Sequence, residues 1–467
     1  MVQHEPARSS AVSPQMEIPV TFRLLPAIIA AAVVSLFSND ARAQSAEMDL
    51  VKSRIRQSLS SGLASVPVIQ DYQATLQPDG TWPDIDYAST AQSYWPPRTH
   101  LTRMRTMAQA YHWEPSLQGD ATLRDDIFRA FDAWTLRDPQ STNWWYQSIG
   151  TPQALGEVLL LMENEVSAGR LAAGVSLIAR SYVPRSKGAA TNTGANRVDR
   201  AYATMMRGLL TDDAALTSEA FLSIGDTVLV NSAHEFAEGI QPDGSFQQHG
   251  PQLYDAGYGF GYTQNLMKFA SWGTGTAFVF QNRQIRVLVD YLLDGPQWLG
   301  RGNTNDYTAY GRGLTRPNSS AMAPGYGTAI DNAVTICGGY RQPELAAFRQ
   351  RITEVASAGS AVPASALSGN RNFWKSDHIV HHRPEFSISL KTSSTRTLQP
   401  ETGNGEGLKN LHLGDGVTLI QRTGNEYDEI MPAWDWRRLP GTTIEQGTYS
   451  LKPTADWGVY GTSSHAD

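Results

Sequence analysis

The sequence changes its hydrophobic period near residue 370, and this change most strongly limits how the chain can fold. Before it, apolar residues recur at helical spacing, as at Leu101, Met104, Ala108 and Tyr111, which places them on one face of a helix. After it, Phe386, Ile388 and Leu390 alternate with polar residues, which is the period of a β-strand. The chain is therefore predicted to be an α+β multidomain protein.

The predicted helical part covers residues 44–368, and long loops rich in Gly, Asn and Pro separate its helices. Amphipathic helices joined in this way favour helical hairpins packed into one large domain, with the chemistry on the loops. Residues 369–467 are predicted to form antiparallel β structure without a closing pattern, so we expect a truncated β domain.

The N-terminal region has the pattern of a signal peptide over residues 1–43. Arg23 precedes an apolar run from Leu24 to Phe37, and Ala41-Arg42-Ala43 is typical of a cleavage site. A run of about 14 residues is too short to span a bilayer comfortably. We expect a secreted or periplasmic protein with no stable membrane association after cleavage.

Composition excludes several classes of protein. The formal net charge of -7 argues against a nucleic-acid binder, which needs a basic surface. An acidic polysaccharide can still bind where arginines gather in one cleft. Cys337 is the only cysteine, which excludes an internal disulfide and a Cys-rich zinc site, and its apolar neighbours predict a core position.

Asp377, His378, His381 and His382 raise the question of a metal site. Their strand-like context distributes them over both faces, and their spacing lacks the helical geometry of zinc-binding histidine pairs. We expect a structural role, and neither a metal nor a cofactor.

Two loop segments could contact a sugar polymer. Asn143, Trp144 and Trp145 precede a helix together with Tyr146; some of these aromatic rings should be exposed and could stack on sugar rings, or they could form a buried corner. Asn196 follows Gly194 in a predicted loop, where it could form a turn or donate its amide to a carboxylate.

Three further segments carry candidate catalytic groups. His249 and Tyr258 share a glycine-rich stretch that can aim side chains into a cleft, although either residue alone is more often structural. Arg301, Arg312 and Arg316 are either solvated or form an anion-binding fork. The segment from Glu401 to Glu406 is turn-rich, and its two carboxylates could suggest a hydrolase.

Taken in order, these motifs resemble polysaccharide lyase family 8. The resemblance is carried by the following segments: Asn143-Trp144-Trp145, Thr193-Gly194-Ala195-Asn196, Asp243-Gly244-Ser245-Phe246 with Gln248-His249, Gly257-Tyr258-Gly259, Gly311-Arg312 with Arg316, Glu401-Thr402-Gly403-Asn404-Gly405-Glu406, Gly414-Asp415-Gly416, and Trp434-Asp435-Trp436 leading into Pro440-Gly441-Thr442-Thr443. One position departs from the family pattern: Gly407 stands where an Asn is usual.

The resemblance implies an incomplete α/α toroid of helical hairpins followed by the start of an antiparallel β-sandwich domain. It also implies β-elimination on a uronic-acid polysaccharide, with hyaluronan or chondroitin as the expected substrate of a monomeric enzyme. The residues that it places at the site are Asn196, His249, Tyr258 and Arg312 as catalytic groups, Glu401 and Arg316 in support, and Asn143, Trp144, Trp145 and Asn404 in substrate binding.

For this reaction we expect Asn196 and His249 to hold the uronate carboxylate and stabilise the enolate-like state. Tyr258 would remove the C5 proton, with Arg312 lowering the phenol pKa. The sequence does not decide whether His249 or Tyr258 is the base.

Three alternatives stay open at this point. An inverting glycoside hydrolase needs two carboxylates across the cleft, whereas the loops offer mainly His, Tyr, Asn and Arg. A truncated carbohydrate-binding protein would bind polymer without product. A xanthan lyase would share the chemistry and differ in substrate.

Overall fold

The computed structural model describes residues 43–187, 192–317, 321–353, 367–453, 455–458 and 460–461. The predicted signal peptide lies outside these residues except for Ala43. Residues Met48–Asp467 form one compact unit. In the described ranges, no helix combines the length and the apolar character needed to cross a membrane.

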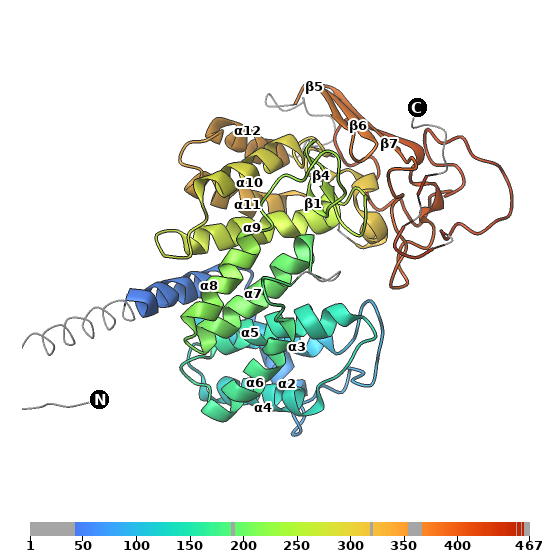
Figure 1. Cartoon of the computed structure of the whole chain (residues 1–467). Helices are drawn as coiled ribbons and strands as arrows, with labels where there is room; N and C mark the ends of the chain where they lie inside the picture. Colours follow the sequence, from blue (N-terminus) through green and yellow to red (C-terminus); the bar gives the residue numbers. More distant parts are fainter. Residues whose placement is uncertain are drawn as a thin grey trace, which may run out of the picture. The chain divides into compact units, whose positions relative to one another are not determined.

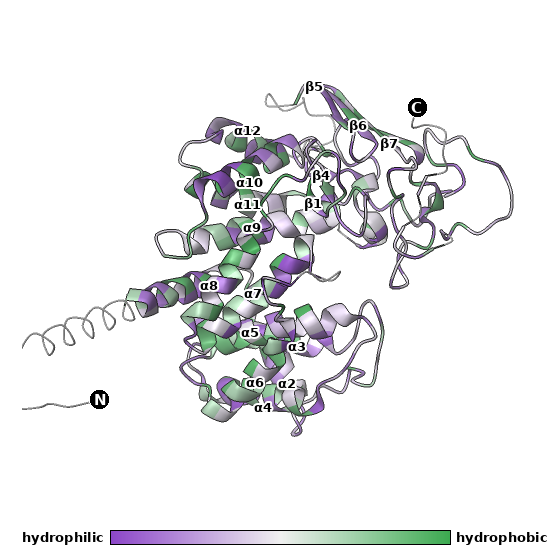
Figure 2. Ribbon diagram, in the orientation of Figure 1, coloured by the Kyte–Doolittle hydropathy of each residue, from purple (hydrophilic) through white to green (hydrophobic). Residues whose placement is uncertain are grey.

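The first part of this unit is helical, as predicted. Residues 48–58 of this unit are helical and are followed by α2 (Val66–Thr75), α3 (Arg98–Trp113), α4 (Ala121–Arg137), α5 (Thr151–Leu161), α6 (Ala168–Ile178), α7 (Gly194–Leu210), α8 (Ala214–Gly225), α9 (Phe260–Gly273), α10 (Asn282–Asp294), α11 (Ala323–Ile336) and α12 (Gln342–Thr353) (Figure 1). The predicted apolar stripe of α3 is buried. Hydrophobic and hydrophilic residues share individual helices, as in α10 and α12 (Figure 2), because one side of each helix packs on its neighbours.

The helices pack as a series of hairpins. Helices α3, α5, α7, α9 and α11 contact one another in succession, and each also packs against the helix that neighbours it in sequence, namely α4, α6, α8, α10 and α12. An inner series with an outer partner for each member is an α/α toroid. The predicted fold class is therefore confirmed.

Local sequence signals start several of these helices. Asp120 caps α4 by accepting a hydrogen bond from the Leu123 amide at 2.7 Å, and Asp213 caps α8 in the same way through Leu216 at 2.9 Å, as expected for Asp at a helix N-terminus. Helix α7 has no such cap from its own Thr193.

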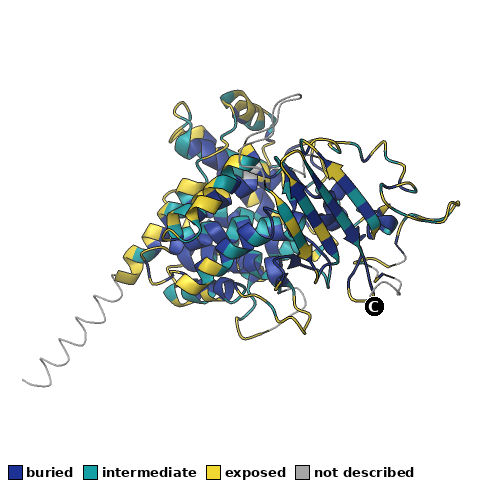
Figure 3. Ribbon diagram, turned by 90° about the horizontal axis from the view of Figure 1, so that it is seen from above, coloured by how far each residue is buried: buried dark blue, intermediate teal, exposed yellow. Residues whose placement is uncertain are grey.

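The second part is a four-stranded antiparallel sheet in the order β5-β6-β7-β8. Its strands are β5 (Gly369–Phe373), β6 (His378–Arg383), β7 (Phe386–Thr392) and β8 (Asp415–Gln421). Figure 3 shows burial alternating along these strands. In β7 the polar residues Ser387, Ser389 and Lys391 are buried, whereas Phe386, Ile388 and Leu390 are only partly buried. Strand β7 therefore turns its polar residues inward, on a buried face to which the neighbouring strands contribute apolar residues such as Val380 and Leu419.

The turn between β5 and β6 holds the segment that leads to the candidate site. Ser376 Oγ lies 2.8 Å from Ser245 Oγ, and Gln247 donates to the Lys375 carbonyl at 2.7 Å. Ser245 and Gln247 belong to a small hairpin, β1 (Gly239–Ile240) and β2 (Phe246–Gln247). The sheet thus fixes the segment that leads directly into His249.

Arg301 has a structural role in this contact and is not part of an anion-binding fork. It lies in a second small hairpin, β3 (Gly300–Arg301) with β4 (Thr304–Asn305). Its guanidinium donates to the carbonyls of Arg422, Arg383 and Pro384 at 2.9, 3.1 and 2.6 Å.

The histidine group is spread over both faces of β6, as predicted. His378 and His382 are buried on one face, and His381 is half-buried on the other. The only cysteine, Cys337, is buried with the apolar core of the helical part, which confirms its predicted position.

Candidate active site

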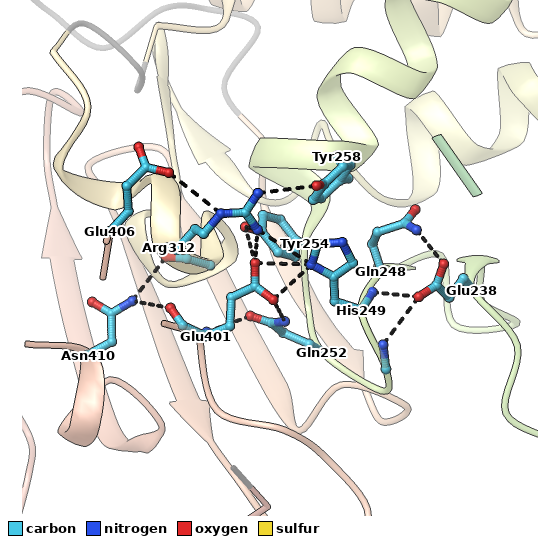
Figure 4. A network of polar contacts seen from close by, with 12 residues as sticks. Glu238, Gln248, His249, Gln252, Tyr254, Tyr258, Arg312, Glu401, Glu406 and Asn410 are labelled. Atoms are coloured by element: carbon cyan, nitrogen blue, oxygen red, sulfur yellow. Dashed lines mark hydrogen bonds and ion pairs between the residues drawn. The ribbon is translucent and has the colours of Figure 1, made fainter. Parts of the chain in front are cut away.

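His249 occupies a fixed position at the end of the β2 segment. Its backbone has φ of 58°, a left-handed conformation that is uncommon for a residue with a side chain. Glu238 holds this backbone, because its carboxylate accepts from the His249 amide at 2.7 Å and also from the Gln248 side chain (Figure 4). Gln248 in turn accepts from the Ala195 amide at 3.1 Å. This contact gives a backbone N–H in the first turn of α7 the hydrogen-bond partner that it lacks within the helix.

Glu401 is the buried centre of the site. Its carboxylate accepts hydrogen bonds from His249 Nδ1 at 2.9 Å, Tyr254 Oη at 3.0 Å, Gln252 Nε2 at 3.3 Å and Arg312 Nη1 (Figure 4). Burial raises the pKa of Glu401, but His249, Arg312 and Tyr254 outweigh it and the pKa is lowered overall. The carboxylate is therefore ionised and can only accept.

An ionised Glu401 determines the tautomer of His249. Because the carboxylate only accepts, Nδ1 of the imidazole carries the hydrogen in this bond. In neutral His249, Nε2 is then the unprotonated nitrogen, and it has no hydrogen-bond partner among the described residues. The ring lines the cleft and can accept a proton there.

Arg312 joins the acidic and phenolic groups of the site. Its guanidinium donates to Tyr258 Oη at 3.3 Å and to Tyr254 Oη at 3.4 Å, in addition to Glu401. Its Nε lies 3.5 Å from Glu406 Oε2. Burial lowers the pKa of Arg312, but Tyr254, Tyr258 and Glu401 raise it by more, so the pKa lies above its ordinary value. The guanidinium is therefore a permanent cation.

The protonation state of Tyr258 differs from the sequence-based expectation. Arg312 was expected to lower the phenol pKa enough to give an active phenolate. Arg312 does lower it, but burial raises it more, and the pKa of Tyr258 lies above its ordinary value. Resting Tyr258 is therefore a phenol that carries a proton to donate. Its ring packs edge-on against His249 with centroids 4.8 Å apart.

Asn196 lies in the first turn of α7 rather than in a loop, so that part of the prediction was wrong. The helix begins at Gly194, whose φ of 48° brings the backbone so close to Gln248 that a Cβ would lie 2.1 Å from its Oε1. Asn196 is buried, and its Oδ1 has no hydrogen-bond partner. Ala195, the residue before it, lines the cleft.

The aromatic segment forms another part of the cleft wall. Trp144 is exposed, Trp145 is half-buried and Tyr146 is buried, which agrees with the expectation that some of these rings face solvent. Arg200 lies over the Trp144 ring at 5.1 Å. Asn143 also lines the cleft, but its amide is engaged with the Gln92 carbonyl and the Trp145 amide.

Arg316 and Asn404 also line the cleft, as expected from the resemblance. Arg316 forms a two-pronged ion pair with Glu406 at 2.7 and 2.5 Å. Asn404 has φ of 53°, and its carbonyl accepts from Ser93 Oγ at 3.0 Å. The cleft has a volume of about 970 Å³, so these groups surround a space large enough for a ligand of several rings.

Gly407, the position that departs from the family pattern, allows the chain to pass close to Glu401. Its φ is 70°, and a Cβ there would lie 2.5 Å from the Glu401 carbonyl oxygen and 2.7 Å from Asn410 Nδ2. Asn410 donates to that same carbonyl at 2.9 Å (Figure 4). In this chain the close approach requires glycine.

Several functional neighbours were not identified from the sequence. Tyr254 and Gln252 lie in the same glycine-rich stretch as His249, a signal that could have indicated Tyr254. Trp457 lies 5.3 Å from the His249 ring and Arg312 lies 5.3 Å from the Trp457 centroid. Nothing in the local sequence indicates Glu238, because its role depends on a contact made by folding.

Comparison with known proteins agrees with this geometry. Residues 44–349 match the N-terminal alpha-helical domain of polysaccharide lyase family 8, and residues 368–466 match its super-sandwich domain. A chondroitinase-AC from Pedobacter heparinus is 32% identical over 91% of this chain and 61% of its own length. A xanthan lyase from Bacillus sp. is 28% identical over 89% of the chain and 50% of its own length. A hyaluronate lyase from Thermasporomyces composti is 28% identical over 83% of this chain and 53% of its own length.

Solved structures give the same result. A chondroitinase AC lyase studied as enzyme–oligosaccharide complexes superposes with a TM-score of 0.81 at 31% identity, over 89% of this chain and 60% of that one. The Streptomyces coelicolor chondroitin AC lyase shares the fold, with a TM-score of 0.73 at 22% identity, over 91% of this chain and 64% of that one. The chain thus spans between half and about two thirds of the length of these relatives. On the matched domains and this likeness, the chain belongs to polysaccharide lyase family 8.

Proposed function

We propose that this protein is a polysaccharide lyase that cleaves a uronic-acid-containing polymer by β-elimination. The observation that carries the proposal is the cluster of His249, Tyr258, Arg312 and Glu401 in one cleft wall. A base with a free nitrogen lies beside a phenol that keeps its proton. β-Elimination needs both groups at the same sugar unit: a base for its C5 proton and a proton donor for its C4 oxygen.

The reaction removes the C5 proton of the uronate, forms the C4–C5 double bond and expels the C4 oxygen. His249 Nε2 accepts the C5 proton, and Glu401 stabilises the resulting imidazolium through Nδ1. Tyr258 donates its phenol proton to the leaving oxygen while Arg312 stabilises the developing phenolate. Each such proton transfer contributes about 10²–10⁴ in rate.

Asn196 is assigned to the uronate carboxylate. The carboxylate resists the additional charge that forms when C5 loses its proton, and an amide donor at that position stabilises the enolate-like state. The donor to the carboxylate is Asn196 Nδ2, because the amide oxygen can only accept, and the neighbouring Ala195 lines the cleft.

Hyaluronan or chondroitin is the proposed substrate. Relatives named chondroitinase-AC and hyaluronate lyase support this choice. A relative named xanthan lyase makes xanthan the alternative to test alongside them. The cleft carries a permanent cation at Arg312 and exposed indole at Trp144, a combination suited to an anionic sugar chain.

The test is ultraviolet absorbance of purified protein incubated separately with hyaluronan, chondroitin sulfate and xanthan. We expect a rising band from the conjugated unsaturated uronate with hyaluronan or chondroitin sulfate. Tyr258→Phe should lose almost all of this activity while keeping its fold. Reducing ends without the band would indicate a hydrolase, and binding without product would indicate a non-catalytic carbohydrate-binding protein.

Two further properties belong to this proposal. We propose that the protein is secreted or periplasmic, supported by the apolar run from Leu24 to Phe37 and the Ala41-Arg42-Ala43 site. We also propose that it is a monomer. N-terminal sequencing of protein recovered outside the cytoplasm should begin near Gln44, and sedimentation equilibrium should give the mass of one chain.

A further inference from the structure

A second cavity of about 390 Å³ adjoins the catalytic cleft. It shares Tyr94, Arg316 and Glu406 with the cleft lining. These three residues therefore border both spaces, which makes the second cavity the neighbour of the cleft on this side.

The second cavity has apolar residues in its lining. Leu314, Met431 and Trp436 line it, and all three are buried in the apolar cluster of the β part. The Trp436 indole nitrogen donates to the Met431 carbonyl at 3.2 Å. An apolar lining of this kind suits the carbon-bearing face of a sugar ring.

The rim of the second cavity carries an exposed lysine, Lys409. The charges of Arg316 and Glu406 cancel in their ion pair. Lys409 is exposed and has no ion pair or hydrogen bond among the described residues. Glu429 also lines the cavity, but it is already engaged with a partner of its own. Lys409 is therefore an exposed cation on this rim that can contact an anionic group of a ligand.

Tyr94 stands at the junction of the two spaces. Its side chain is 70% exposed, so its ring is accessible to a ligand at this junction. Its backbone has φ of 49°. The neighbouring Ser93 donates to the Asn404 carbonyl at 3.0 Å and thereby fixes this segment beside the loop that carries Glu406.

We propose that the second cavity is a further saccharide subsite, which binds a unit of the same anionic polymer beyond those held in the cleft. Tyr94 stacks on the sugar at the junction, and Lys409 contacts a carboxylate or sulfate of the unit inside. This inference rests on the proposed function, because it takes the polymer in the cleft to be an acidic polysaccharide. It predicts that long substrates bind more tightly than short ones.

The test uses oligosaccharides of increasing length prepared from the polymer that the protein degrades. Lys409→Gln should raise KM for long oligosaccharides about fivefold, the effect of one exposed charge contact, and leave kcat and the KM of the shortest cleaved oligosaccharide unchanged. Tyr94→Ala should raise KM for long substrates by about the same factor. Lys452→Gln is the matched control: it removes an exposed lysine of the β part that lies outside both cavities and pairs with Asp456.

The outcomes separate this inference from the proposed function. If Lys409→Gln changes KM equally at all lengths, or at none, the subsite is refuted and the lyase activity stands. If folded wild-type protein gives no unsaturated product from any of the three polymers, the proposed function fails and the subsite fails with it. Binding of long and short oligosaccharides to Tyr258→Phe protein, followed by tryptophan fluorescence, should reproduce the length dependence without turnover.

Discussion

Glu401→Gln is the substitution that most directly tests the arrangement of the site. It keeps the shape of the side chain but removes the charge, and it replaces one acceptor oxygen by an NH₂ donor. In the wild-type protein the Glu401 carboxylate accepts hydrogen bonds from His249, Arg312, Tyr254 and Gln252. An amide cannot accept from all of these donors, so at least one of them loses its partner.

The stability effect follows from the buried ion pair. Removing one partner of a buried pair costs about 3–5 kcal/mol. Here Glu406 remains 3.5 Å from Arg312 Nε and compensates part of the lost charge. We therefore expect Glu401→Gln to lower the free energy of unfolding by about 3 kcal/mol, the lower end of that range, measured by urea unfolding.

The activity effect follows from the tautomer of His249. Without a carboxylate at Nδ1, the amide can donate to that nitrogen and favour the tautomer in which Nε2 carries the hydrogen. The base is then lost, and kcat should fall by about 10²–10⁴, measured by initial rates of unsaturated product formation at a pH where the variant is folded.

Glu406→Gln is the control for this experiment. It removes a carboxylate that also lies against Arg312 but does not touch His249. We expect Glu406→Gln to lower the free energy of unfolding. We expect its kcat to fall much less than that of Glu401→Gln. Equal loss of kcat in both variants, or kcat of Glu401→Gln within threefold of wild type, would refute the role assigned to the Glu401–His249 contact.

Three further predictions follow from the protonation states and the backbone. Because the pKa of Tyr258 is raised, the fall of kcat on the alkaline side should begin only above about pH 10; a rate that keeps rising through pH 10 would instead indicate a phenolate base. Burial raises the pKa of Asp255 to about 8, so the folded state retains a proton that the unfolded state loses above about pH 4. Unfolding free energy should therefore decrease by up to about 1.4 kcal/mol per pH unit between these values. Asp255→Asn should remove that decrease in urea unfolding measured from pH 5 to 9, and an unchanged slope would contradict the assignment. Gly407→Ala should lower both stability and kcat, because its Cβ would lie 2.5 Å from the Glu401 carbonyl oxygen; wild-type melting and turnover would show that the loop adapts.

The sequence by itself determined the order and type of the structural elements. The helical period at Leu101 to Tyr111 and the alternation from Phe386 onward reflect local backbone geometry, so they were readable without tertiary contacts. Cys337 was placed in the core on its apolar neighbours alone. The same local reasoning singled out the loops that contain His249, Tyr258, Arg312 and Glu401, and resemblance to a family supplied their roles.

Only the tertiary structure decided how these residues act. His249 and Glu401 are 152 positions apart in the chain, and no local pattern encodes that their side chains meet. The raised pKa of Tyr258 depends on burial, which arises only when distant segments pack around it. The position of Asn196 in the first turn of α7 depends on Gln248, which satisfies a backbone amide that a local cap would otherwise satisfy.

The inward orientation of the polar residues of β7 has the same origin. The alternation in β7 fixes which residues share a face, but not which face packs against the helical part. Ser376 and Gln247 decide this through hydrogen bonds between segments distant in sequence. Local periodicity therefore determined the elements of this protein, whereas long-range packing determined the orientation of its sheet, the tautomer of His249 and the charge state of Tyr258.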